Sequence, residues 1–324
     1  MHRGNTTRRM MTGLLAAAAV VRPARAATSI RIGTLRFGSL AWEMDVIRHH
    51  GLDRGFTLEP VEFASGPASQ TALQAGAVDM VLQDWIWTSR LRSDGADWTF
   101  APATAALGAI VVPADSPIKG LTDLRGRRLG IAGGPLDKSW LLLRLYGERE
   151  TRLDLDTVVE KVFGPPPLLA TQLDLGRLDA MLTYWPFVAR AEAQGRRVVI
   201  DMADVLAGLG VPRGLPILGY VFAEPWAVAN RDALTAFLTA AAQARQILMT
   251  SDAEWTRISP LTGTSDSAEL TQLRNWYRRG AIGPWTDDAR LAADRLFALF
   301  ASIGGAALVG SARSLAPGTF WQAG

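Results

Sequence analysis

Residues 72–85 read ALQAGAVDMVLQDW, and residues 172–185, one hundred positions later, read QLDLGRLDAMLTYW. The stretches share Leu73/Leu173, Gly76/Gly176, Asp79/Asp179, Leu82/Leu182 and Trp85/Trp185. Each has the pattern of a helix end, a glycine able to adopt the left-handed conformation, and a short apolar strand. The repeat predicts two similar α/β lobes, although any helix, glycine and strand unit can converge on such a pattern.

Polar and aromatic residues follow the apolar strand in both stretches. They are Gln83, Asp84 and Trp85 in the first stretch and Thr183, Tyr184 and Trp185 in the second. In an open α/β sheet, ligands bind beyond the carboxyl ends of the strands. We therefore expect these residues to form facing walls of a ligand cleft between the lobes.

The N-terminus has the organisation of a secretory signal peptide. Arg8 and Arg9 precede an apolar run over residues 13–21, and the small-residue motif Ala24-Arg25-Ala26 follows. We expect cleavage after Ala26 and a free periplasmic protein, with the general and twin-arginine export routes both open. The chain has no cysteine, which excludes a disulfide and a lipidated N-terminal cysteine.

The basicity of the chain belongs to this predicted signal. Residues 1–26 hold five arginines and no acidic residue, so removing them changes the formal net charge from +3 to −2. The charge therefore indicates no nucleic-acid partner. The 298 residues that remain are enough for two domains of ordinary size.

Two predicted helix starts carry small residues. Ser65 and Gly66 precede Pro67, and Gly133 with Gly134 precedes Pro135 and a helix that includes Lys138. Free backbone N–H groups at such a start can bind an anionic or carbonyl group. Plain capping explains a serine and a glycine there equally well.

No catalytic, cofactor or metal motif is present. After signal removal the histidines are His49 and His50, adjacent at a predicted helix end, which disfavours a histidine metal site. The chain lacks a GxSxG elbow, an HExxH pair, a phosphate loop and a GxGxxG fingerprint. We therefore predict no catalytic residues, no metal and no cofactor.

Several segments together resemble a known group of proteins. They are IRIG (30–33), HHGLDRGF (49–56), SGPASQTALQAGAVDM (65–80), DSPIKGLTDLRGRRLGIAGG (115–134) and LLATQLDLGRLDAML (168–182). The chain is similar to the substrate-binding proteins of ABC importers in the nitrate, sulfonate and taurine group, whose superfamily includes thiamine-pyrimidine precursor-binding proteins. The resemblance implies a type II periplasmic-binding-protein fold, with two α/β lobes joined by two crossing strands. These strands would be 109–113 outward and 219–222 on return, so lobe 1 would comprise 27–112 and 219–324, and lobe 2 would comprise 113–218.

The resemblance also points to ligand contacts at strand ends and helix starts of both lobes. With the residue chemistry added, the candidate ligand-binding set is Arg36, Trp42, Ser65, Gly66, Asp84, Trp85, Gly133, Gly134, Lys138, Tyr184 and Trp185. For nitrate or a sulfonate, Arg36, Lys138 and the helix starts would supply donors. For a heteroaromatic or cationic solute, tryptophan faces and the Asp84 carboxylate would serve. The second set is better represented, which favours a small organic solute that contains nitrogen or an aromatic ring.

The function implied by the resemblance is capture of this small molecule in the periplasm by a monomer, and its delivery to an ABC importer permease in the inner membrane. Two alternatives are a secreted accessory or sensor protein and a nitrate- or sulfonate-specific binder. A thiamine-pyrimidine synthase-type enzyme is disfavoured, because that branch relies on a cysteine-rich run and an active-site histidine.

Overall fold

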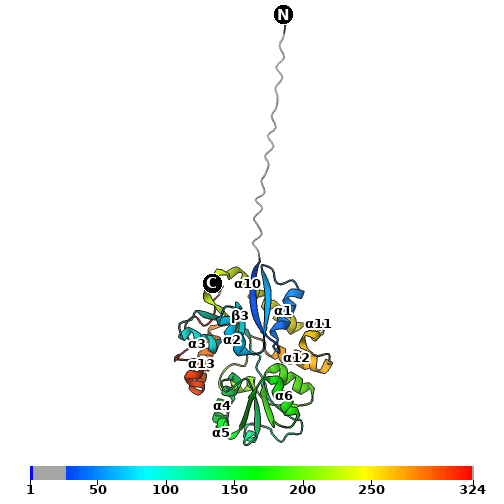
Figure 1. The fold of residues 1–324 in the computed structure, drawn as a ribbon, viewed down its shortest axis with the longest axis vertical. Helices are drawn as coiled ribbons and strands as arrows, with labels where there is room; N and C mark the ends of the chain where they lie inside the picture. Colours follow the sequence, from blue (N-terminus) through cyan, green and yellow to red (C-terminus); the bar gives the residue numbers. More distant parts are fainter. Residues whose placement is uncertain (3–26, 323–324) are drawn as a thin grey trace.

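The computed structural model describes residues 1–2 and 27–322 and contains two α/β lobes, one above the other in Figure 1. Each lobe has a five-stranded sheet with helices packed against it. This arrangement confirms the two lobes predicted from the repeat. The predicted signal peptide lies, apart from its first two residues, outside the described residues.

The first lobe is built from both ends of the described chain, and its sheet has the strand order β2-β1-β3-β10-β4. Strands β1, β2 and β3 are parallel, whereas β10 is antiparallel to β3 and β4. Its elements are β1 (Thr28–Leu35), α1 (Leu40–His49), β2 (Phe56–Phe63), α2 (Gly66–Gln74), β3 (Met80–Asp84), α3 (Trp85–Ser93), β4 (Trp98–Thr104), β10 (Leu218–Ala223), α9 (Glu224–Ala229), α10 (Arg231–Thr250), α11 (Asp252–Thr262), α12 (Ser267–Arg279) and α13 (Asp287–Val309).

The second lobe comes from the middle of the chain, and its sheet has the strand order β7-β6-β8-β5-β9. Strand β6 is parallel to β7 and β8, and β5 is antiparallel to β8 and β9. Its elements are β5 (Ala109–Val112), the 3₁₀ turn η1 (Leu121–Leu124), β6 (Arg128–Ala132), α4 (Lys138–Thr151), α5 (Leu155–Val158), β7 (Glu160–Gly164), α6 (Pro166–Asp174), β8 (Ala180–Thr183), α7 (Trp185–Ala193), β9 (Arg197–Asp201) and α8 (Met202–Gly208).

The repeated residues have the same structural role in both lobes. The carboxylate of Asp79 accepts a 2.8 Å hydrogen bond from the backbone N–H of Arg31, and Asp179 accepts one of equal length from Arg128. Each aspartate directly precedes its strand, β3 or β8, and thereby links it to the neighbouring parallel strand, β1 or β6. Gly76 has a φ of 70°, in the left-handed region where glycine has no Cβ to clash. The repeat is thus a real fold unit used twice.

The two passages between the lobes differ from the predicted ones. Strand β5 lies wholly in the second sheet and β10 wholly in the first, so neither is a crossing strand. The chain passes outward through residues 105–108 and returns through residues 209–217. The apolar run 105–112 is divided at Gly108, and β5 begins only at Ala109. A glycine is needed at position 108, because a Cβ there would lie 1.6 Å from the Thr183 carbonyl oxygen. The outward passage therefore precedes the boundary expected at residue 112.

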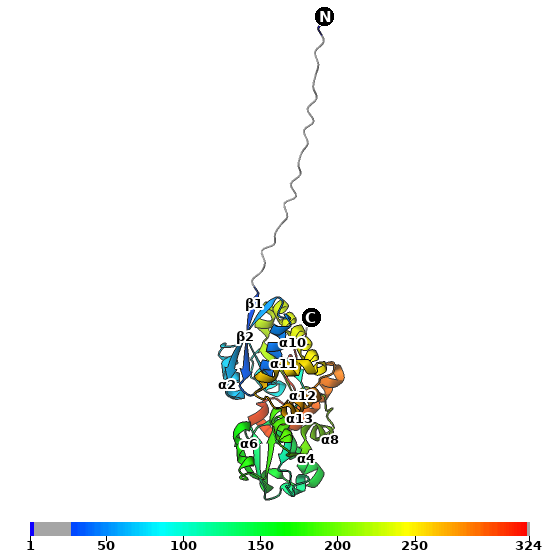
Figure 2. The ribbon, with the colours of Figure 1, turned by 90° about the vertical axis from the view of Figure 1, so that its right-hand side faces the viewer.

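The last helices of the chain contact both lobes. Helix α12 packs against α7, and α13 packs against both α3 and α4. Figure 2 shows α12 and α13 at the level where the lobes meet. Helix α13 is long and apolar enough to cross a membrane by length and composition. Its side chains Leu296, Phe297 and Phe300 are buried in the fold, as in a core helix of a globular protein.

Candidate functional site

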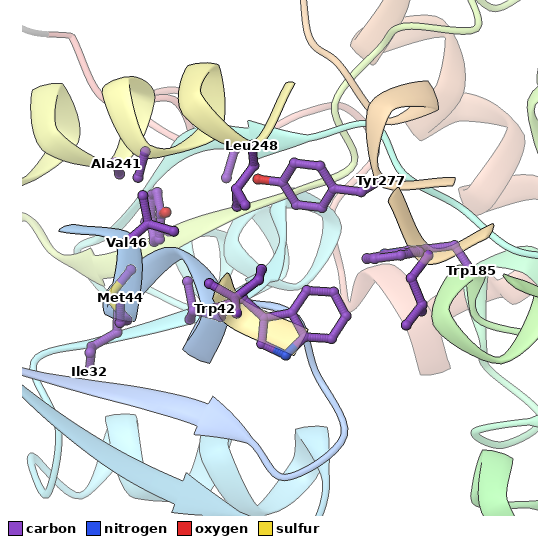
Figure 3. Packing of buried hydrophobic residues seen from close by; sticks show 14 of the residues in the cluster. Ile32, Trp42, Met44, Val46, Trp185, Ala241, Leu248 and Tyr277 are labelled. Carbon is purple, nitrogen blue, oxygen red and sulfur yellow. The ribbon is translucent and has the colours of Figure 1, made fainter. Parts of the chain in front are cut away.

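An aromatic contact joins the two lobes. Trp42, from α1, meets Trp185, the first residue of α7, edge to face with ring centroids 5.9 Å apart. Tyr277, from α12, meets Trp185 at the same centroid distance, and Figure 3 shows the three side chains converging from different elements. Trp42 is 4% exposed and Trp185 is 7% exposed, so these rings cover one another. This contact helps to hold the lobes together, because edge-to-face pairs are favourable aromatic arrangements.

A polar contact also joins the lobes. Asp84 is the last residue of β3 and the N-cap of α3, and its Oδ1 accepts a 2.9 Å hydrogen bond from the Trp87 backbone N–H. Its other oxygen, Oδ2, lies 2.7 Å from Nζ of Lys138, the first residue of α4 in the second lobe. Asp84 is only 4% exposed. The ion pair therefore connects a strand end of one lobe to a helix start of the other.

Asp137, next to Lys138, repeats this geometry from the second lobe. Its Oδ1 accepts hydrogen bonds from the backbone N–H groups of Ser139 and Trp140, which caps α4. Its Oδ2 lies 3.5 Å from the Tyr184 hydroxyl, which donates to it at the end of β8. We refer to Asp84, Asp137, Lys138 and Tyr184 as the interlobe polar cluster.

Gly133 allows the second-lobe part of this cluster to pack closely. Its φ of 92° is one that side-chain-bearing residues rarely adopt. A Cβ at this position would lie 3.0 Å from the Tyr184 hydroxyl oxygen and 3.1 Å from Asp137 Oδ2. A glycine is therefore required on both conformational and steric grounds.

Burial raises the pKa of two members of the cluster, Asp137 and Tyr184. Burial raises the pKa of Asp137 to about 6, the Lys138 ammonium opposes that rise, and the Asp84 carboxylate adds to it. Burial also raises the pKa of Tyr184 above its usual value, and the neighbouring Asp137 carboxylate reinforces the effect. At neutral pH, Tyr184 is therefore a neutral donor, and the cluster contains two carboxylates and one ammonium group.

Trp85 does not lie with Trp185, contrary to the sequence prediction. It is 0% exposed, its indole N–H donates to the Pro216 carbonyl oxygen at 3.0 Å, and its ring meets Phe320 edge to face. As the first residue of α3, it packs beneath the return passage and the C-terminal segment, in a different core cluster from Trp185. Trp85 is thus a core residue and cannot line a ligand site in this arrangement.

Arg36 also lies apart from the cluster. Its side chain is 75% exposed, and its Nε pairs with Glu62 of β2 at 2.9 Å. Surface ion pairs of this kind contribute little to stability. The structure therefore gives Arg36 a solvated partner, and its predicted place in the ligand site has no support from the geometry.

The residues at the predicted helix starts take part in hydrogen bonds within the protein. Ser65 Oγ accepts from the Ala68 N–H at 3.4 Å, which caps α2, and the Gly66 carbonyl oxygen accepts from Gln83 Nε2 at 3.3 Å. The Gly133 N–H donates to the Gly164 carbonyl oxygen at 3.1 Å, and the Gly134 carbonyl oxygen accepts from the Asp137 N–H at 2.9 Å. Capping accounts for Ser65, and Gly133 offers no free donor.

One member of the cluster was not predicted from the sequence, and one residue expected at the cleft has a hydroxyl that the described residues leave unsatisfied. Asp137 was absent from the candidate set, although an aspartate between a Gly-Gly-Pro run and a helix is a typical N-cap. Thr183, at the end of β8, has a buried hydroxyl with no hydrogen-bond partner among the described residues. A buried polar atom of this kind is costly unless water or a ligand satisfies it. The described part of the chain contains no group of three residues able to hold a metal ion.

The chain is similar to known proteins in sequence and in structure. A family model described as NMT1/THI5 like matches residues 53–254. The chain belongs to this family. The matched residues include both repeated stretches and all four members of the interlobe polar cluster, whereas Trp42 and Tyr277 of the aromatic contact lie outside the match.

One curated relative is the "Putative aliphatic sulfonates-binding protein" of Escherichia coli (strain K12), which is 28% identical over 149 residues. The match covers 45% of this chain and 46% of the relative, about half of its length. A similar solved structure is the alkanesulfonate-binding protein SsuA from Xanthomonas axonopodis pv. citri bound to MOPS. It has a TM-score of 0.70 and 18% identity, and the match covers 92% of this chain and 99% of that one.

The desulfurization enzyme DSZB is also similar in structure, with a TM-score of 0.59 and 16% identity over 86% of this chain and 92% of the enzyme. These likenesses confirm the type II periplasmic-binding-protein fold that the resemblance implied. Because the same fold occurs in a binding protein and in an enzyme, the fold alone does not decide between the two activities.

Proposed function

We propose that this family member is a periplasmic solute-binding protein that captures a small organic molecule between its lobes and delivers it to an ABC importer. The observation that carries the proposal is the ion pair between Asp84 and Lys138, because it brings a strand end of one lobe against a helix start of the other. In open α/β sheets, ligands bind at this edge. Hinge closure of two such lobes around a ligand is a well-established motion.

The chemistry of the cluster favours binding over catalysis. Tyr184 has a raised pKa, which makes its hydroxyl a weak acid and a poor proton donor to a reaction. The chain has no cysteine to act as a nucleophile. His50 lies at the C-terminal end of α1 and pairs with Glu254 at 3.2 Å, within the first lobe. A binding role requires only the groups that the cluster contains.

Export and transport rest on two further observations. The signal-like segment at residues 1–26 supports a periplasmic location. Membership of the family, together with a curated relative named as a sulfonates-binding protein, supports delivery of a solute to an importer. The partner in that case is a permease in the inner membrane, and the protein acts as a monomer.

A thermal-shift screen of the mature chain against amines, pyrimidines, aromatic acids, sulfonates and nitrate tests the binding role. A ligand at 100 times its Kd stabilises the folded state by about 2.7 kcal/mol. Such a gain raises the Tm by roughly 4–5 °C for a chain of about 300 residues. Calorimetric titration of the best ligand should then give one site per chain.

Two charge-reversal variants locate the site. Asp84→Lys places a second ammonium beside Lys138 and should abolish binding. Asp94→Lys makes the same change at the exposed C-terminal cap of the same helix, α3, and should leave binding intact. Absence of any Tm increase across all classes with folded protein, or equal loss of binding in both variants, would contradict the proposal.

A further inference from the structure

Both carboxylates of the interlobe polar cluster are held in the same way. Oδ1 of Asp84 caps α3 and Oδ1 of Asp137 caps α4, so each carboxylate is fixed by backbone N–H groups. The second oxygen of each points to a partner outside its own helix, which is Lys138 for Asp84 and Tyr184 for Asp137. Two fixed Oδ2 atoms are therefore presented where the lobes meet.

The charge balance of the cluster favours a cation. With both aspartates ionised and Lys138 protonated, its formal charge is −1. A ligand with one positive charge can pair with Asp84 without adding negative charge, whereas an anion would add to the excess negative charge in a poorly solvated place. Like charges that are shielded from water repel strongly. The raised pKa of Asp137 has the same origin, since one ammonium group does not compensate two carboxylates and their burial.

At two helix starts next to the cluster, its own carboxylates already occupy backbone N–H groups. An anion bound at a helix N-terminus needs free backbone N–H groups. At α3 and α4, the donors at Trp87, Ser139 and Trp140 already bind aspartate oxygens. An anionic ligand at these N–H groups would have to displace a carboxylate from its own helix cap.

We propose that the solute carries a protonated nitrogen, which binds Asp84 in place of the Lys138 ammonium. The inference rests on the proposed function and specifies its ligand as a small primary amine, an amidine or a protonated heteroaromatic base. Without solute, Lys138 occupies the position of the ligand cation, with its Nζ 2.7 Å from Asp84 Oδ2. The Asp137 carboxylate and the Tyr184 hydroxyl lie on the other lobe and provide further polar contacts for the same nitrogen.

Matched probes separate charge from shape. The mature chain is titrated at pH 7.5 with butylamine and benzylamine, with butanesulfonate and phenylmethanesulfonate, and with butanol and benzyl alcohol, each followed by tryptophan fluorescence and thermal shift. Each scaffold then appears as cation, anion and neutral molecule. We expect the amines to bind at least about tenfold more tightly than the alcohols, as for a hydrogen bond to a charged group, and the sulfonates to bind most weakly.

Two substitutions with opposite expected signs test the residues. Asp84→Asn keeps an oxygen that can cap α3 but removes the charge, and should weaken amine binding about tenfold or more. Lys138→Met removes the internal competitor and should tighten amine binding, which an anion site would not do. Asp154→Asn, the same change at the cap of α5, is the matched control and should have no effect.

The outcomes distinguish this inference from the proposed function. If the sulfonates bind more tightly than the amines, and Lys138→Met removes that binding, the inference is wrong while the solute-binding function stands. If amine affinity is unchanged in both Asp84→Asn and Lys138→Met, Asp84 is not the cation site. If the broader ligand screen also finds no binder, the solute-binding function itself is contradicted.

Discussion

Replacing Trp85 by alanine should destabilise the first lobe without changing ligand affinity. The side chain is fully buried, and its indole N–H satisfies the Pro216 carbonyl oxygen. A tryptophan buries about 200 Å², which at about 25 cal/mol per Å² corresponds to about 5 kcal/mol. Losing the hydrogen bond costs about 1 kcal/mol more, and relaxation of the cavity recovers part of both. We expect a net loss of about 3–5 kcal/mol, the usual range for such truncations.

Equilibrium urea unfolding followed by far-ultraviolet circular dichroism measures this loss, because that signal does not depend on tryptophan number. Ligand affinity is measured on the same variant well below its transition. Trp185→Ala is the matched comparison, since Trp185 lies at the contact between the lobes. It should weaken ligand binding by about 1–3 kcal/mol, as for loss of an aromatic anchor.

Either of two results would contradict a pure core-packing role for Trp85. One is a Trp85→Ala protein whose free energy of unfolding lies within about 0.5 kcal/mol of wild type, as for a surface position. The other is a loss of ligand affinity in Trp85→Ala as large as that in Trp185→Ala. Either result would mean that Trp85 does not serve as core packing alone.

Three further changes have defined outcomes. Burial raises the pKa of Asp137 from 3.8 to about 6, so the folded state loses stability as pH rises through this range. Asp137→Asn cannot ionise. Urea unfolding should therefore show its free energy of unfolding gaining up to about 3 kcal/mol relative to wild type between pH 3.5 and pH 7.5. Oε2 of the buried Glu43 lies 3.5 Å from Nη1 of the partly buried Arg245. Glu43→Ala leaves Arg245 without its carboxylate partner and should cost about 3 kcal/mol, with Glu43→Ala/Arg245→Met regaining part of it; equal stability of the single variant and wild type would contradict this. Gly133→Ala should cost at least about 1 kcal/mol and weaken ligand binding, because its Cβ meets the Tyr184 hydroxyl; unchanged unfolding and affinity would count against the close packing.

The repeat predicted the two lobes because its residues act locally. Asp79 and Asp179 join neighbouring strands, and Gly76 and Gly176 adopt left-handed backbone conformations just after helices. These roles depend on neighbouring residues and on strands of the same unit. The spacing of a sequence pattern can therefore reveal them.

The repeat could not predict that its two tryptophans have different surroundings. Trp85 contacts Pro216, 131 residues later, and Phe320 near the C-terminus, whereas Trp185 contacts Trp42 and Tyr277. These partners come from distant parts of the chain that lie outside the repeat. Local similarity therefore placed both indoles at one site, and long-range packing separates them.

The sequence pattern also did not predict helices α3 and α7. Their sequences, WIWTSRLRS and WPFVARAEA, begin with bulky aromatic residues, which are weaker helix formers, just after a strand. Proline is compatible with the first turn of a helix, so Pro186 does not prevent α7. Because the helix starts went unrecognised, Asp84 was interpreted as a strand-end ligand residue and its capping role was missed.

The predicted positions of the two passages between the lobes were wrong for a similar reason. An apolar run such as 105–112 indicates a buried strand but not the sheet to which the strand belongs. The structure divides this run at Gly108, where the chain passes closely against the end of β8. Only tertiary contact could reveal that division.

A crystal structure of the mature protein with the tightest ligand from the screen would directly test whether the solute binds between the lobes through Asp84. We expect the ligand between the lobes, with a protonated nitrogen within hydrogen-bond distance of Asp84 Oδ2. Lys138 Nζ, which lies 2.7 Å from that oxygen without ligand, should have moved away from it. A ligand bound within one lobe, or bound while the Asp84 and Lys138 pair stays intact, would contradict this expectation.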